Sequence, residues 1–174
     1  MRNCVWACIA MAGLAVSIQA EEPKSDAAKS TGLDKIKKLV GTWVAADDKG
    51  QPTDQVVSVF KLTAAGSAVQ ETIMPGTAHE MVSVYHKDGK DVVMTHYCAL
   101  GNQPKMRLDP ASTDKELKFV FVGGTNLDPA KDMHMHEGTI KWIDDDHIEW
   151  TWQGYQDGKA AKGHGISMKL VRKK

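Results

Sequence analysis

Two histidines, His134 and His136, stand one residue apart in a segment rich in strand-forming residues. Alternate side chains of a strand share a face, so these imidazoles would lie about 6.5–7 Å apart along the backbone. They could supply two ligands of a tetrahedral zinc ion, with a third ligand from elsewhere. We expect that third ligand among the remaining candidates, which are His79, His96 and His164. Copper or another transition metal is an alternative, because Cys98 stands close to His96.

The histidines have a second interpretation that needs no metal. Imidazole nitrogens hydrogen-bond to one another and to loop carbonyl oxygens, and such a network would close the mouth of a barrel. Both interpretations stay open at this point.

Cys98 also has two interpretations. The other cysteines, Cys4 and Cys8, lie in a predicted signal peptide, which leaves Cys98 without an intramolecular disulfide partner. It is either a small buried hydrophobic residue or a thiolate activated by His96 or His79. No recognised nucleophile signature surrounds it, and we assign no catalytic residue.

The elements that must position these residues are mostly strands. A short helix is expected over 33–39, where leucine and isoleucine recur at helical spacing. Ten strands are expected after it, at 41–47, 55–63, 67–74, 80–86, 91–98, 103–109, 116–123, 134–143, 147–155 and 163–172. Most connections are too short for a parallel crossover. The fold class is therefore all-β, a ten-stranded antiparallel up-and-down barrel with one short N-terminal helix. A two-sheet sandwich is the alternative.

Two hairpins can be registered from their patterns. Asp88-Gly89 predicts a two-residue type I′ turn, which pairs Tyr85 with Val92 and Met81 with His96. In the second hairpin, a loop of Asp144 to Asp146 pairs apolar side chains with one another on the inner face. The pairs are Trp142 with Ile148, Ile140 with Trp150, Gly138 with Trp152 and, on the outer face, Lys141 with Glu149. Strand alternation then places His134 and His136 on the inner face with Gly138.

Successive turns of a meander alternate between the two ends of a barrel, so five of the seven histidines are expected at one end. The interior and this mouth supply the residues predicted to bind a ligand. They are Met81, Tyr85, Met94, His96, Cys98, Asn102, Gln103, Trp142, Trp150 and Trp152. A barrel of ten strands has room for a small molecule.

The composition argues against nucleic acid as a partner. The 174 residues include 22 Lys and Arg and 22 Asp and Glu, so the formal net charge is zero. Nucleic-acid binding needs a basic surface, which this balance does not favour. Residues 1–20 have the basic start, apolar centre and small-residue end of a secretory signal peptide. The chain is thus predicted to be exported to the periplasm or the cell exterior, without a transmembrane segment, with a polar leader at 21–31 and one domain at 32–174.

The motifs of the chain resemble a known class. Leu-Val-Gly-Thr-Trp at 39–43 resembles the first strand of lipocalin-like (calycin) barrels. The segments 79–90, 95–98, 101–104 and 134–136 resemble a family of exported bacterial lipocalin-like proteins of unknown function. This resemblance implies the barrel and supplies no activity. A looser similarity to nitrobindins implies a haem held by a histidine of the last strand, which here would be His164.

The sequence favours a binding protein for a small apolar or amphipathic ligand over an enzyme. A metal or haem protein that uses His134 and His136 with His96 or His164 is the second hypothesis. A structural role in the cell envelope without a ligand is the third. Oligomeric state does not follow from the sequence.

Overall fold

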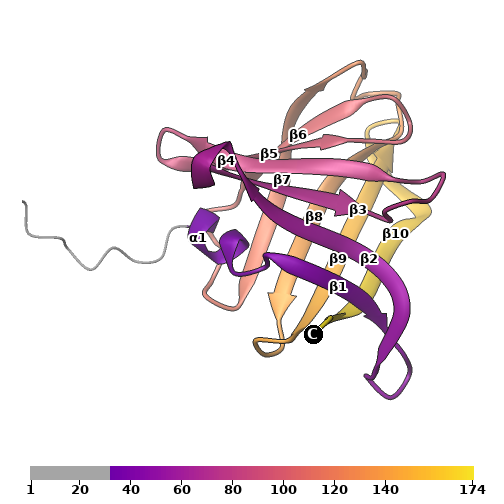
Figure 1. Ribbon diagram of the computed structural model, residues 1–174. Coiled ribbons are helices and arrows are strands. Elements are labelled where there is room, and N and C mark those ends of the chain that lie inside the picture. The colour runs from indigo at the N-terminus through magenta and orange to yellow at the C-terminus, as the bar shows by residue number, and fades with distance from the viewer. Residues whose placement is uncertain (1–31) are drawn as a thin grey trace, which may run out of the picture.

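A computed structural model describes residues 32–174 of the chain (Figure 1). The predicted signal peptide and leader lie outside these residues. The described chain consists of a short helix, ten strands and one 3₁₀ turn: α1 (Gly32–Lys37), β1 (Gly41–Ala46), β2 (Pro52–Thr63), η1 (Ala64–Gly66), β3 (Ala68–Ile73), β4 (Met81–Asp88), β5 (Asp91–Tyr97), β6 (Gln103–Leu108), β7 (Glu116–Thr125), β8 (His134–Trp142), β9 (His147–Gln156) and β10 (Lys159–Arg172).

The strands form a closed antiparallel barrel in which each strand pairs with its sequence neighbours and β1 pairs with β10. This confirms the predicted fold class, the ten strands and the N-terminal helix. Closure leaves no strand edge of the described barrel open for pairing with another chain. Because the barrel is a meander, its turns alternate between two ends. One end carries α1 together with the β4–β5 and β8–β9 turns, and we name it the helix end (Figure 1).

The β8–β9 hairpin has the predicted register at its closed end. Trp142 pairs with Ile148, Ile140 with Trp150 and Gly138 with Trp152, and Lys141 faces Glu149 on the outer face. The prediction succeeded here because a slip of one residue would have placed a charged side chain among the tryptophans.

The β4–β5 hairpin corrects a prediction. Tyr85 pairs with Met94 and Ser83 with His96, two residues away from the predicted register. The two-residue loop is Gly89-Lys90 rather than Asp88-Gly89, and Gly89 has a φ of 58°. Glycine thus holds the first central position, which is where a type II′ turn needs it. A shift of two residues keeps every side chain on its predicted face, so Ser83, Tyr85, Val92, Met94 and His96 are all buried.

The helix α1 packs its apolar face against the core at the helix end. Its residues Leu33 and Ile36 are buried, as is Leu39 beyond it. The indole Nε1 of Trp43 donates to the carbonyl oxygen of Leu39 over 2.8 Å, which ties β1 to the end of the helical segment. From β10, the guanidinium of Arg172 lies 4.4 Å from the centre of the Trp43 ring. This end of the barrel is therefore held by packing, hydrogen bonds and a cation–π contact.

Candidate functional site

A fully buried carboxylate, Glu71 of β3, lies inside the barrel. Its Oε1 accepts a 2.7 Å hydrogen bond from the hydroxyl of Ser58 on β2, and its Oε2 accepts a 2.6 Å bond from the phenol of Tyr85 on β4. Inward-facing residues pair across three strands here, since Glu71 pairs with Ser83, which in turn pairs with His96 of β5. Adjacent strands thus bring these polar side chains together.

Burial controls the ionisation of Glu71. Removal from water raises the pKa of its carboxyl group from 4.5 to about 7, although the hydrogen bonds from Tyr85 and Ser58 act in the opposite direction. An ionised carboxylate in an apolar interior is costly, and two donors offset only part of that cost. Glu71 is therefore able to take up or release a proton near neutral pH.

His96 extends the polar row by one strand. Its Nδ1 lies 3.0 Å from the hydroxyl oxygen of Ser83, and its side chain is buried. Burial lowers the pKa of this imidazole from 6.5 to about 4, so the ring is neutral at neutral pH. None of the described residues offers a hydrogen-bond partner to the buried His96 Nε2.

Two tryptophans of β9 also have buried polar atoms without a hydrogen-bond partner. Trp150 and Trp152 are buried, and no described residue accepts a hydrogen bond from either indole Nε1. Trp152 packs against β8 at Gly138, where an added Cβ would overlap ring atoms Cε3 and Cζ3.

Aromatic rings connect the tryptophans with the carboxylate cluster. Phe119 of β7 lies 6.5 Å from Trp152 and 5.6 Å from Tyr85, measured between ring centres. Trp150 and Trp152 meet edge to face at 5.4 Å. We define Ser58, Glu71, Ser83, Tyr85, His96, Trp150 and Trp152 as the interior cluster. It combines an aromatic wall with donors and acceptors, a combination that suits a small amphipathic molecule.

The other residues predicted to bind a ligand fall into two places. Met94 is buried in the core, and Met81 and Trp142 pack against it, whereas Cys98 is a half-buried free thiol beyond the end of β5. Asn102 and Gln103 brace the loops at the end opposite α1. Asn102 donates from Nδ2 to the carbonyl oxygen of Met133, and Gln103 donates to that of Gly101.

The strand pairing around His134 and His136 departs from the prediction. The β8–β9 register shifts between Met135 and Glu137, so β8 contains a bulge at His136. Met135 consequently pairs with Gly154, and His134 pairs with Tyr155, which is on the opposite face of β9 from Trp152. A bulge adds one residue and reverses the alternation beyond it, and nothing in the sequence announced this one.

The two imidazoles bond to each other. His134 Nε2 lies 2.9 Å from His136 Nδ1, and His134 Nδ1 lies 2.8 Å from the carbonyl oxygen of Asp132. A carbonyl oxygen only accepts, so Nδ1 of neutral His134 carries the proton and its Nε2 accepts from His136. His136 also stacks on Tyr155, with 3.8 Å between ring centres. Burial, and then the neighbouring His134, lower the pKa of His136, while Glu137 raises it.

The remaining predicted metal ligands do not join this pair. His79 and His164 are exposed, and His96 belongs to the interior cluster. Within residues 32–174, no three His, Cys, Asp or Glu side chains come together in a group that could hold a metal ion.

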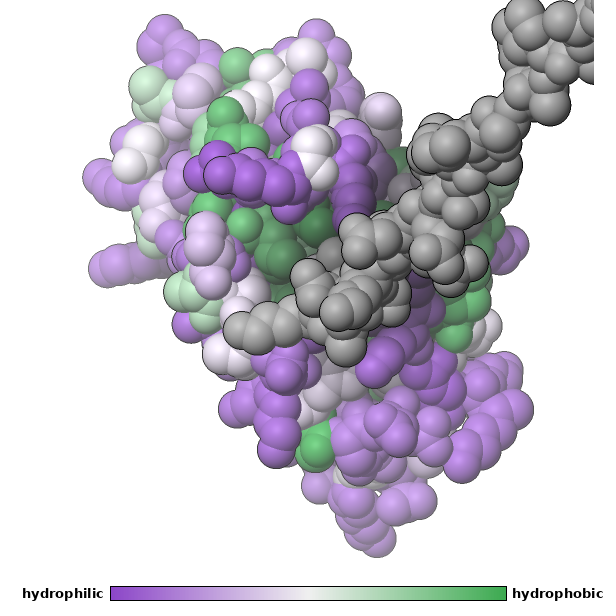
Figure 2. Space-filling view, turned by 90° about the vertical axis from the view of Figure 1, so that its left-hand side faces the viewer, coloured by the Kyte–Doolittle hydropathy of each residue, from purple (hydrophilic) through white to green (hydrophobic). Residues whose placement is uncertain are grey.

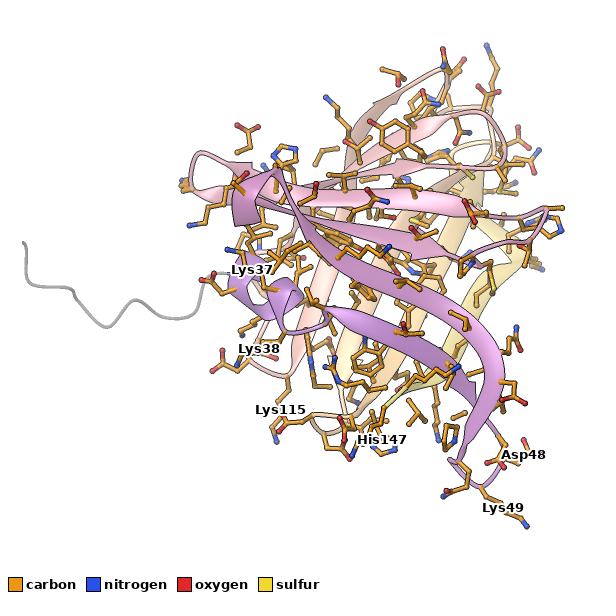
Figure 3. The ribbon with its side chains drawn as sticks, in the orientation of Figure 1. Lys37, Lys38, Asp48, Lys49, Lys115 and His147 are labelled. Atoms are coloured by element: carbon orange, nitrogen blue, oxygen red, sulfur yellow. The ribbon has the colours of Figure 1, made fainter. Side chains whose placement is uncertain are left out.

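A wide cleft opens at the helix end, opposite to the end where the histidines predicted a mouth. Its volume is about 1580 Å³. Apolar side chains of the barrel wall line it, and Figure 2 shows apolar surface at this end surrounded by hydrophilic side chains. These apolar residues include Val92, Leu108, Leu117 and Trp142. Basic side chains at its margin include Lys38 and Lys115, which Figure 3 shows at the end of the barrel that carries α1.

Sequence reasoning missed Glu71 and Ser58 as members of the site. A usable signal was present, because Glu71 alternates with Val69 and Ile73 in a strand and so had to share their inward face. A charged residue at an inward position is a marker of function or of a specific partner. Tyr85, which the sequence placed among the residues predicted to bind a ligand, donates its hydroxyl group to Glu71.

The structure thus defines a closed ten-stranded barrel with a buried polar cluster. Neither the models of known protein families nor the curated proteins include a match to this chain. The lipocalin-like family and the nitrobindin similarity remain predictions from motifs. No helix within the described residues is long and apolar enough to cross a membrane.

Proposed function

We propose that this protein is an exported barrel that binds a small apolar or amphipathic ligand in its interior, in contact with the interior cluster. One observation supports this function more than any other. Three polar atoms of this cluster are buried without a partner among the described residues: His96 Nε2, Trp150 Nε1 and Trp152 Nε1. Leaving such a group unsatisfied costs about 1–3 kcal/mol. A ligand that carries hydrogen-bonding groups on an apolar body would remove this cost.

The chemistry of the three atoms describes the ligand. The indole N–H groups of Trp150 and Trp152 only donate, so the ligand needs an acceptor oxygen or nitrogen for them. The rings of Phe119 and both tryptophans favour an apolar body beside that acceptor. Binding, rather than catalysis, is the function we assign. The hydroxyl of Ser83 lies 3.0 Å from His96 Nδ1 within this cluster, and we assign neither side chain a catalytic role.

A metal or haem protein remains the second candidate from the sequence. Both nitrogens of His134 already take part in hydrogen bonds, and His164 is exposed on β10. These observations favour the ligand-binding function, and the experiments distinguish the two candidates.

The proposed function can be tested by NMR with indole ¹⁵N-labelled protein and 1-decanol, whose hydroxyl group both donates and accepts. We expect the Nε1–H resonances of Trp150 and Trp152 to shift on titration. Trp43 is an internal control, because its Nε1 already donates to Leu39 over 2.8 Å and should not respond. Trp152→Phe keeps an aromatic ring but loses the donor, and should weaken binding about tenfold, which corresponds to roughly 1.4 kcal/mol.

Two results would reject the function. The first is the absence of any shift at Trp150 and Trp152 at saturating 1-decanol. The second is equal affinity of the wild type and of both Trp150→Phe and Trp152→Phe, which would place the alcohol elsewhere.

A further inference from the structure

The floor of the cleft at the helix end consists of residues of the barrel core. Val92 and Leu117 line the cleft although only 5% and 1% of their surface is exposed. Trp142 is half-buried beside the cleft, and Ile143, which follows it, is 56% exposed. An apolar patch with a polar rim is typical of a binding site. The volume of about 1580 Å³ is ample for a molecule with a long alkyl chain.

Ion pairs between the elements around the cleft neutralise part of its charge. From α1, Lys35 Nζ donates to the carbonyl oxygen of Thr113 over 2.9 Å and pairs with the carboxylate of Asp114. From β10, Arg172 Nε lies 3.5 Å from the carboxylate of Asp146, in the β8–β9 turn. All of these residues line the cleft except for the continuation of the strands beneath them. The charges of these pairs offset each other, so they do not decide the charge of a ligand.

The remaining charges at the rim of the cleft have both signs. Asp144 accepts a 2.7 Å hydrogen bond from the ring of His147. The other charged residues that line the cleft form no ion pair within residues 32–174. They are Lys38, Lys90, Lys115, Asp91, Asp109 and Asp145. Three ammonium groups and three carboxylates therefore surround the apolar floor without an ion-pair partner in the described chain.

This balance of charges favours one kind of head group. A carboxylate head would be attracted by the lysines and repelled by the aspartates, and a cationic head would be affected in the reverse sense. A head that carries both charges is attracted by both sets. Trp142 adds an aromatic ring to the lining, and aromatic rings attract quaternary ammonium groups. A phosphocholine head, with its phosphate anion and its quaternary ammonium, therefore suits these residues.

We propose that the cleft at the helix end binds a single-chain amphiphile with a zwitterionic head, of the alkyl phosphocholine class. Its alkyl chain lies on the floor formed by Val92, Leu117 and Ile143, and its head lies among the lysines and aspartates of the rim. This site is separate from the interior site of the proposed function, because no member of the interior cluster lines the cleft. The inference therefore does not depend on that function.

The site is tested by NMR of indole ¹⁵N-labelled protein, titrated with dodecylphosphocholine below its micelle concentration. We expect the Nε1–H resonance of Trp142 to shift, while those of Trp150 and Trp152 stay in place. Ile143→Asp should weaken binding about tenfold, because it places a charge beside the alkyl chain. Ile166→Asp is the matched control, since Ile166 is 49% exposed and lies outside the lining of the cleft. A response at Trp150 or Trp152 but not at Trp142, or equal weakening by the two variants, would overturn the proposal.

The head group is tested by calorimetry with three amphiphiles that share a dodecyl chain. Dodecylphosphocholine should bind about tenfold more tightly than either dodecanoate or dodecyltrimethylammonium. Two triple variants change the balance of the rim: Lys38→Gln with Lys90→Gln and Lys115→Gln, and Asp91→Asn with Asp109→Asn and Asp145→Asn. The first should come to prefer the cationic amphiphile, and the second the anionic one. Equal affinity of the wild type for all three amphiphiles, or an unchanged preference in both triple variants, would overturn the proposal.

Discussion

The phenol of Tyr85 donates a 2.6 Å hydrogen bond to the carboxylate of Glu71, and both side chains are fully buried inside the barrel. This contact places a titratable group in an apolar interior. It also makes the stability of the barrel depend on pH.

Glu71 should lower the free energy of unfolding as pH rises. The folded state holds the Glu71 proton to about pH 7, whereas the unfolded carboxyl group loses it near 4.5. The stability that Glu71 contributes is therefore present below pH 4.5 and lost as pH rises to about 7, a loss of about 3 kcal/mol. His96 acts in the opposite direction, since its pKa falls from 6.5 to about 4 and its contribution is lost as pH falls through that range.

These two contributions should offset each other in the wild type between pH 4.5 and 6.5. Glu71→Gln removes the Glu71 contribution and leaves that of His96. The free energy of unfolding of the variant should therefore rise as pH rises from 4.5 to 6.5, and should not fall toward pH 7. Urea unfolding at pH 5, 6.5 and 8 measures this. Identical pH profiles for variant and wild type would mean that the pKa of Glu71 is the same in the folded and the unfolded protein.

Gly138→Ala should destabilise the barrel by about 1–3 kcal/mol through overpacking. The added Cβ would overlap the Trp152 ring, which fills the space beside Gly138. Gly154→Ala is the matched control on the paired strand, because its Cβ would come only to 3.2 Å from its nearest neighbours. Thermal unfolding compares the two, and an equal or smaller loss for Gly138→Ala would contradict the packing described for Trp152.

Arg172→Lys should cost about 2 kcal/mol of stability at the helix end. Arg172 donates from Nη1 to Val40 and from Nη2 to Lys38, each over 2.8 Å, while its guanidinium covers Trp43. Lysine has one charged nitrogen and no planar face with which to replace these contacts. Lys174→Ala is the control, because its 2.9 Å ion pair with Asp146 is exposed and should be worth less than about 0.5 kcal/mol. Similar losses in the two variants would show that Arg172 acts only as a surface charge.

Replacing His134 and His136 together with alanine should lower stability by about 2 kcal/mol, because the Asp132 carbonyl oxygen loses its donor. The amount of ligand or metal that copurifies with the protein should not change. His164→Ala, at an exposed position, should leave stability within about 0.5 kcal/mol of the wild type. Loss of a bound metal or haem in the double variant would instead favour the metal hypothesis.

Much of the fold follows from alternation and turn residues. The tryptophans and the Lys141–Glu149 pair favoured the β8–β9 register, because a slip of one residue would have buried a charge. The Asp88-Gly89 pair misplaced the neighbouring hairpin by two residues, since glycine suits either central position of a tight turn. The bulge at His136 has no local sequence signal, so the strand pairing beside the histidines could not be predicted.

The site was harder to predict than the fold. The β4–β5 hairpin pattern predicted that Tyr85 and His96 share a face, but Glu71 contacts Tyr85 across the β3–β4 pair, whose register no turn signal in the sequence determines. Which buried polar side chains come into contact depends on the register of several strand pairs. Such contacts can be identified only once all of these registers are known.

Native mass spectrometry with elemental analysis tests the central claim most directly. The protein is isolated without a chelator or a histidine tag from a host that exports it. We predict a 1:1 noncovalent adduct of a small organic molecule that is lost on denaturation and depleted in Trp152→Phe. A bare polypeptide mass, or a stoichiometric metal or haem in place of an organic adduct, would contradict the account.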